Sequence, residues 1–70
     1  MSTEYTTFSK LIKEVRKQLG LSQEDLAHKL GVSFATINRW ENGKTSPSKL
    51  AKAQFDSYLS QMKREGRFHE

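Results

Sequence analysis

Two short segments near the middle of the chain, Gly20-Leu21-Ser22 and Gly31-Val32-Ser33, constrain its fold more than any other feature. In each segment glycine suits the left-handed residue that ends a helix, and serine is a preferred N-cap for the next helix. Asp25 follows Ser22 at the spacing of a capping box. The two segments therefore predict successive helices joined by short turns.

Apolar residues repeat at helical spacing before, between and after these segments. The first helix is predicted to start near Thr7, after a loose polar arm over residues 1–6, and the third to span about Ser33 to Asn42. Asn42-Gly43 is interpreted as a helix end, because no alternating strand pattern flanks it. The predicted inward-facing residues of the first three helices are Phe8, Leu11, Ile12, Val15, Leu19, Leu26, Ala27, Leu30, Ile37 and Trp40.

A fourth helix is predicted at about 47–65, with Ser46 as its N-cap and Pro47 at its first position. Gly66 follows its expected end. The helix is long because its apolar stripe is not interrupted by a glycine or a second proline. The residues of this stripe are Ala51, Phe55, Tyr58, Leu59 and Met62.

The chain has 70 residues and no cysteine, so it is expected to form one domain, residues 1–70, held together by packing alone. The predicted fold is all-α and compact, with four or five helices. Disulfides and thiolate metal sites are excluded, and His28 and His69 lie too far apart in the sequence to suggest a zinc site. No metal or other cofactor is expected.

Lys and Arg total 12 against 8 Asp and Glu, which gives a net charge of +4 and a bias towards polyanions. That charge is by itself weak support for nucleic-acid binding. The sequence contains no signal peptide and no membrane span, which predicts a cytoplasmic protein without membrane contact. It also lacks a motif-linked nucleophile and base and a glycine-rich phosphate loop, so an enzyme is not expected. No small-molecule effector is evident.

The turn at Gly31 joins two capped helices at about 22–42, and the second of them carries polar and small residues on its outward face. This arrangement can insert a helix into the major groove of double-stranded DNA. The block LSQEDLAHKLGVS followed by INRWENGK resembles the lambda-repressor-like helix-turn-helix domains, also called Cro/C1-type or XRE family. The resemblance runs from Phe8 to Pro47. It implies a sequence-specific DNA-binding transcriptional regulator of the repressor type, whose second and third helices contact DNA.

Five residues at the start or on the outward face of the third helix are the candidate base readers: Phe34, Ala35, Thr36, Asn38 and Arg39. Arg39 can donate two hydrogen bonds to guanine O6 and N7. Phe34 either contacts a thymine methyl group or folds back onto the core. Thr36 and Asn38 can reach bases or phosphates, and the sequence does not decide between them.

The candidate phosphate contacts are Gln23, Ser33, Lys44 and Thr45. Gln23 opens the second helix, where backbone amides and the positive end of the helix dipole favour a phosphate, and the resemblance implies the same role. Ser33 is expected both to cap the third helix and to stand near a phosphate. The resemblance also implies a second phosphate contact at Lys44 and a structural ion pair between Arg16 and Glu41.

The resemblance further implies a homodimer on a palindromic site. The chain departs from the family after Pro47, where one predicted helix replaces the usual glycine-centred turn between helices four and five. A helix of about eighteen residues is about 27 Å long, more than a three-helix core covers. We therefore expect Leu59, Met62 and Phe68 to extend past the core and to support a homodimer through the C-terminal helix.

Two alternatives keep the fold and change its use. The chain can be a protein-interaction or DNA-targeting domain of a larger protein, or an antitoxin-type autoregulator. Hydrogen-bond donors at Gln23, Arg39 and Lys44 favour DNA binding. A domain that no longer bound DNA would have little reason to keep all three.

Overall fold

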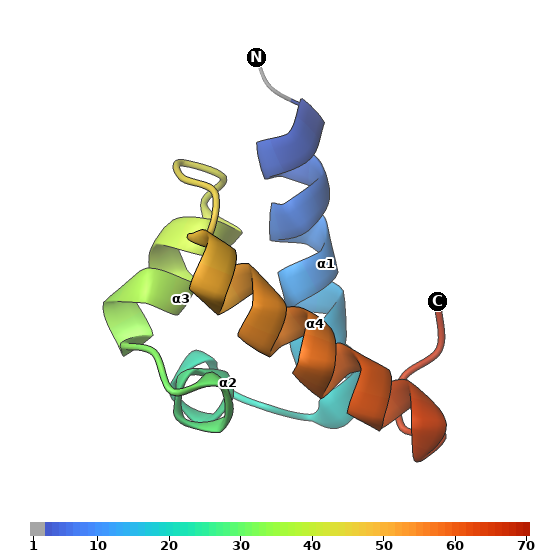
Figure 1. The fold of residues 1–70 in the computed structure, drawn as a ribbon. Helices are drawn as coiled ribbons and strands as arrows, with labels where there is room; N and C mark the ends of the chain where they lie inside the picture. The colour runs from blue at the N-terminus through green and yellow to red at the C-terminus, as the bar shows by residue number, and fades with distance from the viewer. Residues whose placement is uncertain (1–2) are drawn as a thin grey trace.

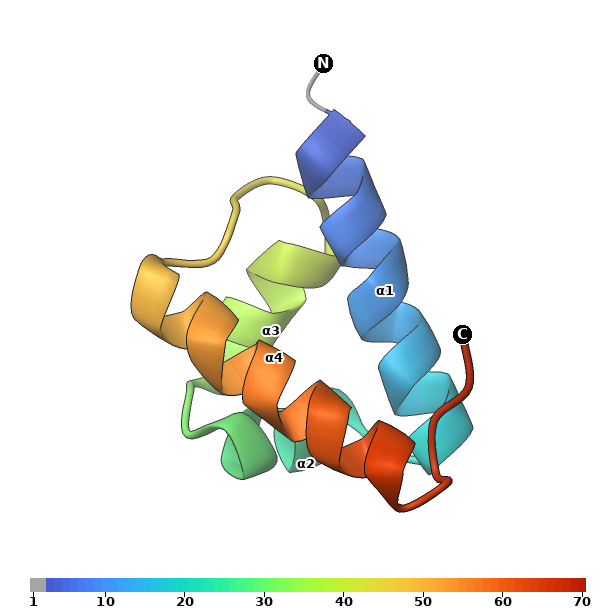
Figure 2. The ribbon, with the colours of Figure 1, turned by 45° about the vertical axis from the view of Figure 1, so that its right-hand side comes forward.

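The computed structural model of the chain describes residues 3–70, which form four helices and no strand within that range (Figure 1). In chain order the helices are α1 (Thr3–Leu19), α2 (Gln23–Leu30), α3 (Phe34–Glu41) and α4 (Lys49–Arg64). α4 lies across the other helices, as two views of the ribbon show (Figures 1 and 2). The predicted all-α, four-helix fold is confirmed.

The turns on either side of α2 have the predicted chemistry. The Ser22 hydroxyl accepts a hydrogen bond from the Asp25 amide at 3.0 Å, and the Asp25 carboxylate accepts one from the Ser22 amide at 3.1 Å, which completes the capping box. Gly31 has φ = 71°, a left-handed conformation that turns the chain between α2 and α3. Ser33 caps α3 by accepting a hydrogen bond from the Thr36 amide at 3.1 Å.

One face of each helix contributes to the core, and Phe8 links three of the helices. The Phe8 ring meets the rings of Trp40 and Phe55 edge to face, at centroid distances of 5.4 and 5.3 Å, a favourable geometry for aromatic pairs. α1, α3 and α4 are therefore joined at one point. The buried core residues are Phe8, Ile12, Val15, Leu26, Ala27, Leu30, Ile37, Trp40, Phe55, Leu59, Met62 and Phe68.

The start of α4 differs from the prediction. Its N-cap is Ser48, whose hydroxyl accepts a hydrogen bond from the Ala51 amide at 3.2 Å, and not Ser46. Pro47 therefore lies just before the cap rather than at the first helical position. Two serines flank this proline, and the sequence alone does not show which hydroxyl meets a free amide.

The expectation that the end of α4 extends past the core is wrong. Leu59, Met62 and Phe68 are only 7%, 4% and 3% exposed. After α4 the chain turns back and seats Phe68 in the core. The Gln18 side chain then donates to the His69 carbonyl at 2.7 Å and accepts from the His69 amide at 2.8 Å. The apolar stripe is used within the domain, so it no longer supports a homodimer through α4.

The N-terminal end of α1 also differs from the prediction. The helix begins at Thr3 rather than near Thr7, so most of the segment predicted as a loose arm is helical. Neither glycine nor proline interrupts the sequence before Phe8, so nothing in this segment prevents the helix from starting earlier. Residues 1–2 of the predicted arm lie outside the described residues.

Candidate nucleic-acid interface

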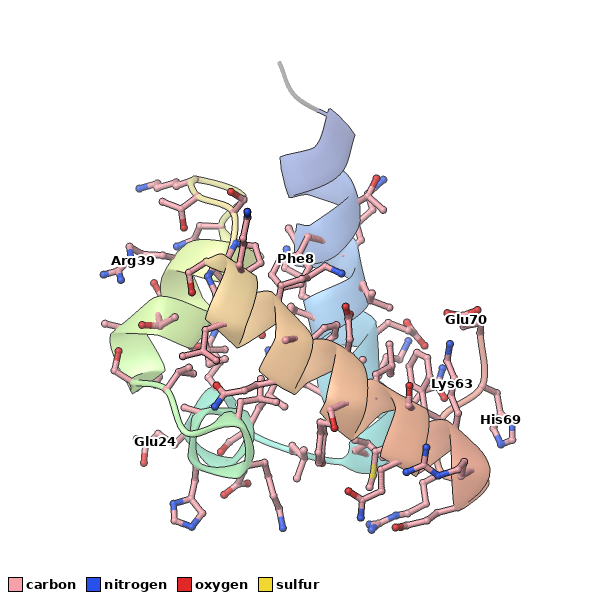
Figure 3. The ribbon with its side chains drawn as sticks, viewed as in Figure 1. Phe8, Glu24, Arg39, Lys63, His69 and Glu70 are labelled. Atoms are coloured by element: carbon pink, nitrogen blue, oxygen red, sulfur yellow. The ribbon has the colours of Figure 1, made fainter. Side chains whose placement is uncertain are left out.

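The outward side of α3 presents one strong hydrogen-bond donor among apolar groups. Phe34, Ala35 and Arg39 are exposed, and Thr36 and Asn38 are half-buried. Phe34 is 50% exposed to solvent, which excludes the alternative that its ring folds back onto the core. Arg39 extends away from the ribbon on the side of α3, far from the C-terminal residues that Figure 3 labels. The inward face of the helix is apolar, because Ile37 and Trp40 are buried there.

An ion pair fixes the end of α3 to α1. Arg16 donates to both carboxylate oxygens of Glu41, from Nε at 2.5 Å and from Nη2 at 2.9 Å, in a bidentate arrangement. Its remaining Nη1 donates to the Leu21 carbonyl at 3.2 Å. Glu41 is 5% exposed and Arg16 is 26% exposed. The pair thus joins α1, the turn before α2 and the end of α3.

The carboxylate of Glu41 is held in its charged form. Burial raises the pKa of Glu41, but hydrogen bonds from Arg16 and Gln23 and the nearby positive charge outweigh that effect, so its pKa lies below the ordinary value. The same contact raises the pKa of Arg16. Both groups are therefore ionised at neutral pH, and the negative charge of Glu41 is neutralised inside the domain.

Gln23 extends this ion pair into a chain of amides. Its Nε2 donates to Glu41 Oε1 at 3.0 Å, and its Oε1 accepts from Asn38 Nδ2 at 3.2 Å. Asn38 Oδ1 in turn accepts from Asn42 Nδ2 at 3.1 Å. A primary amide carries two N–H groups, so Gln23 keeps one donor at the N-terminal end of α2.

The loop after α3 carries an exposed lysine. Gly43 adopts φ = 70°, and the Lys44 amide donates to the Arg39 carbonyl at 3.4 Å. The side chains of Lys44 and Thr45 are exposed. Ser33, at the opposite end of α3, is exposed and its hydroxyl lies 2.8 Å from that of Thr36.

Sequence reasoning missed one residue that positions α3. Ser9 is buried, and its hydroxyl donates to the Glu41 carbonyl at 2.9 Å, which satisfies a carbonyl at the C-terminal end of the helix. It lies next to Phe8 in the α1 sequence, and only its position beside a core residue could have drawn attention to it.

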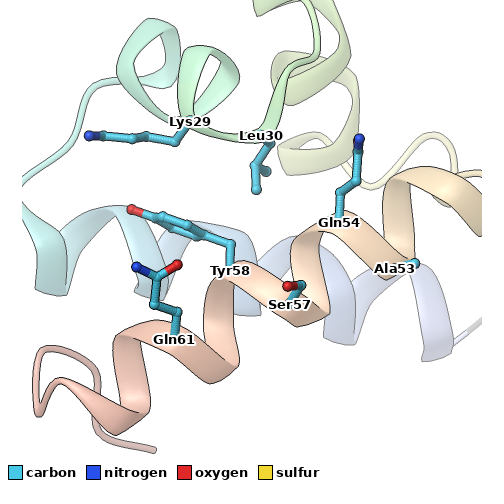
Figure 4. A pocket seen from close by; sticks show the side chains of 7 residues that line it. All are labelled: Lys29, Leu30, Ala53, Gln54, Ser57, Tyr58 and Gln61. Carbon is cyan, nitrogen blue, oxygen red and sulfur yellow. The ribbon is translucent and has the colours of Figure 1, made fainter.

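A groove between α2 and α4 lies apart from the predicted DNA contacts (Figure 4). Its volume is about 410 Å³, and it is lined by Lys29, Leu30, Ala53, Gln54, Ser57, Tyr58 and Gln61. Burial raises the pKa of Tyr58.

In the described part of the chain, His, Asp and Glu residues do not gather into a group that could hold a metal ion. Among the described helices, none has the length and apolar character needed to cross a membrane.

The helix-turn-helix family matches residues 12–51, which include α2, α3 and the turn between them. This match covers more than half of the chain. The chain belongs to the helix-turn-helix family, and its predicted membership in the Cro/C1-type group is confirmed. It is a DNA-binding fold of the kind found in transcription regulation.

Curated relatives resemble the chain over part of their own length. A type II methyltransferase, M1.ScrFI of Lactococcus lactis subsp. cremoris, is 48% identical over 48 residues, 64% of this chain and 12% of that protein. An uncharacterised HTH-type transcriptional regulator of Methanothermobacter thermautotrophicus is 55% identical over 38 residues, 54% of this chain and 55% of that protein. An uncharacterised HTH-type transcriptional regulator, YiaG of Escherichia coli K12, is 41% identical over 46 residues, 66% of this chain and 48% of that protein. No solved structure matches the chain significantly.

Proposed function

We propose that this domain binds double-stranded DNA sequence-specifically, with α3 in the major groove. The observation that carries the proposal is the exposed Arg39 on an α3 surface whose only acidic residue, Glu41, is buried and neutralised. In this docking mode the recognition helix lies in the major groove and its exposed side chains contact base edges. The candidate base-reading residues on this surface are Phe34, Ala35, Thr36, Asn38 and Arg39.

Phosphate contacts would flank this surface on both sides. On one side Gln23 offers its remaining N–H beside the N-terminal amides of α2, where the helix dipole favours an anion. Ser33 stands at the start of α3. On the other side the exposed loop residues Lys44 and Thr45 supply an ammonium, a hydroxyl and backbone amides. These contacts orient the domain on the duplex without reading its sequence.

We assign the regulator to the repressor type. A domain that fills the major groove excludes another protein from the same base pairs, so occupancy alone is sufficient for repression. Two of the similar proteins are named as transcriptional regulators. This role requires the chain to act in the compartment that holds DNA.

A second candidate function is that of a DNA-targeting domain in a larger protein. The similarity to M1.ScrFI, which spans only 12% of that methyltransferase, favours this candidate. The chain also covers about half of the two regulators. Both functions use the same α3 surface and differ in what the domain is joined to.

Selection of bound sequences from a random duplex pool tests the proposal. We expect one enriched half-site that contains a guanine, and Arg39→Ala should relax preference at that base pair by about 1–3 kcal/mol while leaving the fold intact. Lys63→Gln on α4 is the control, because it removes a positive charge from a side chain that Figure 3 places far from Arg39. A pool without any enriched sequence contradicts the proposal.

The free domain is expected to be a monomer. The C-terminal stripe that could have joined two copies is buried, with Leu59 and Met62 only 7% and 4% exposed. A homodimer through α4 is therefore not part of the proposal, and two copies would meet on adjacent half-sites of the DNA. Sedimentation at tens of micromolar measures this directly. A stable dimer without DNA would show that another surface joins the copies.

A further inference from the structure

Two of the five base-reading candidates have their polar groups engaged within the domain. The Thr36 hydroxyl lies 2.8 Å from the Ser33 hydroxyl, and the Ser33 hydroxyl also accepts a hydrogen bond from the Thr36 amide at 3.1 Å. Asn38 donates to Gln23 Oε1 at 3.2 Å and accepts from Asn42 at 3.1 Å. An asparagine reads adenine by turning its oxygen and nitrogen together towards one base. In this domain those two atoms are held by two different neighbours.

The other three candidates are a free guanidinium and two apolar groups. Within residues 7–70, the Arg39 side chain has no hydrogen bond or ion pair with another side chain. Phe34 and Ala35 open α3 and are both exposed. A phenyl ring that keeps 50% of its surface in water gains free energy when an apolar group covers it. The start of α3 is therefore apolar, and its later turn is cationic.

We propose that the domain reads its site through a C5-methyl group and a guanine, an inference that rests on the proposed DNA binding. Phe34 and Ala35 contact the C5-methyl group of a pyrimidine, which is the apolar feature of the major groove. Arg39 donates to guanine O6 and N7. Thr36 and Asn38 are positioning residues: Thr36 fixes the start of α3 through Ser33, and Asn38 holds Gln23 at the phosphate.

The methyl group can belong to thymine or to 5-methylcytosine, which present it at the same place in the groove. Replacing each thymine of the selected site by deoxyuridine removes only this methyl group. We expect about fourfold weaker binding at one or two positions and no change elsewhere, the equilibrium equivalent of exposing one methyl-sized group. At the same positions a 5-methylcytosine duplex should bind about fourfold more tightly than the cytosine duplex. If only one of the two comparisons, thymine against uracil or 5-methylcytosine against cytosine, changes the affinity, that comparison identifies the base that is read.

Phe34→Ala assigns the effect to its side chain. This variant should bind the thymine duplex nearly as weakly as the parent binds the uracil duplex, and should lose most of the sensitivity to uracil, because only Ala35 still contacts the methyl group. The exposure of Phe34 predicts an unchanged melting temperature. Leu50→Ala is the matched control, because Leu50 is the other large apolar side chain that is exposed among those described. Leu50→Ala should keep the full uracil effect.

The outcomes separate this inference from the proposed function. Two results would overturn the proposed methyl contact while leaving DNA binding established. One is a selected site in which no position is sensitive to uracil, and the other is equal uracil sensitivity in the parent and in Phe34→Ala. Unchanged DNA affinity in Phe34→Ala would show that the Phe34 ring does not contact the DNA. Failure to select any site overturns the proposed function itself. Asn38→Ala should weaken all sequences similarly, whereas a preference change at one base pair would make Asn38 a reader.

Discussion

Two groups of polar side chains meet at α3, and they differ in how their hydrogen bonds are used. The first group, Arg16, Gln23, Asn38 and Glu41, is closed: each member is bonded to another, and the charges cancel. The second group, Arg39, Lys44 and Thr45, is open to solvent. Residue type alone therefore does not identify a contact residue. Changes at Arg16 or Glu41 should lower stability, and changes in the open group should lower DNA affinity. Changes at Gln23 or Asn38 should affect both, because the remaining N–H of Gln23 is the proposed phosphate donor.

Arg16→Met should give the largest effect, because it leaves the Glu41 carboxylate buried with only Gln23 as a side-chain partner. Removing one partner of a buried pair is strongly destabilising. Since Arg16 is 26% exposed, we expect the lower end of that range, about 3 kcal/mol in the free energy of unfolding. Urea unfolding measures it, and the exposed Arg64→Met is the control.

A double variant sharpens this test. In Arg16→Met with Glu41→Leu no uncompensated charge remains, and apolar replacement of a buried ion pair is often close to neutral. Most of the lost stability should return. If the double variant is as unstable as Arg16→Met alone, the loss comes from packing or from the Leu21 carbonyl rather than from the charge.

Gly31→Val should destabilise the domain by about 1–3 kcal/mol, because a β-branched residue is strained at positive φ. A Cβ at this position meets no atom within 4 Å, so the penalty arises from the backbone alone. Gly31→Asn is the matched variant, since asparagine tolerates this conformation. The melting temperature of Gly31→Asn should lie between those of the parent and of Gly31→Val. Equal losses for Asn and Val would show that the backbone conformation is not the cause.

The same contrast explains which parts of the structure the sequence could predict. Ser22, Gly31 and Ser33 act through local backbone geometry, which glycine and serine specify by themselves, and their roles were predicted correctly. The burial of Phe68 depends on a chain reversal and on Gln18 from α1, far away in sequence. No local pattern contains that information. The amide chain through Gln23 and Asn38 also requires two helices to be in place first.

Acid should weaken the closed group. The pKa of Glu41 is lower in the folded domain than its ordinary value of 4.5, so the folded state favours the carboxylate. Its contribution to stability is complete above about pH 4.5 and is lost as the pH falls through the folded pKa. The pKa of Asp25 is lowered in the same direction, chiefly by its hydrogen bond with the Ser22 backbone.

Unfolding free energies of the parent and of Glu41→Gln between pH 7 and pH 2 isolate the Glu41 part of this effect. The parent should lose more stability below about pH 4.5 than the variant, which cannot titrate at this position. The variant retains the Asp25 contribution, so its curve should still fall. Parallel curves for the two proteins would mean that Glu41 has the same pKa in the folded and unfolded states.

Lys44→Gln should have the smallest effect and should act only on the open group. Lys44 is exposed in the loop after α3, so the fold and melting temperature should not change. Loss of one phosphate contact should weaken binding to all sequences alike and reduce the slope of log K against log salt by about one unit.

Lys63→Gln removes the same charge on α4, where Lys63 pairs with Glu70 at 2.9 Å. It should leave the slope unchanged, because a distant charge releases no counterion from the DNA. Parallel salt titrations for Lys44→Gln and the parent would remove Lys44 from the interface. A reduced slope in both variants would instead show that net charge, rather than a contact at the end of α3, sets the salt dependence.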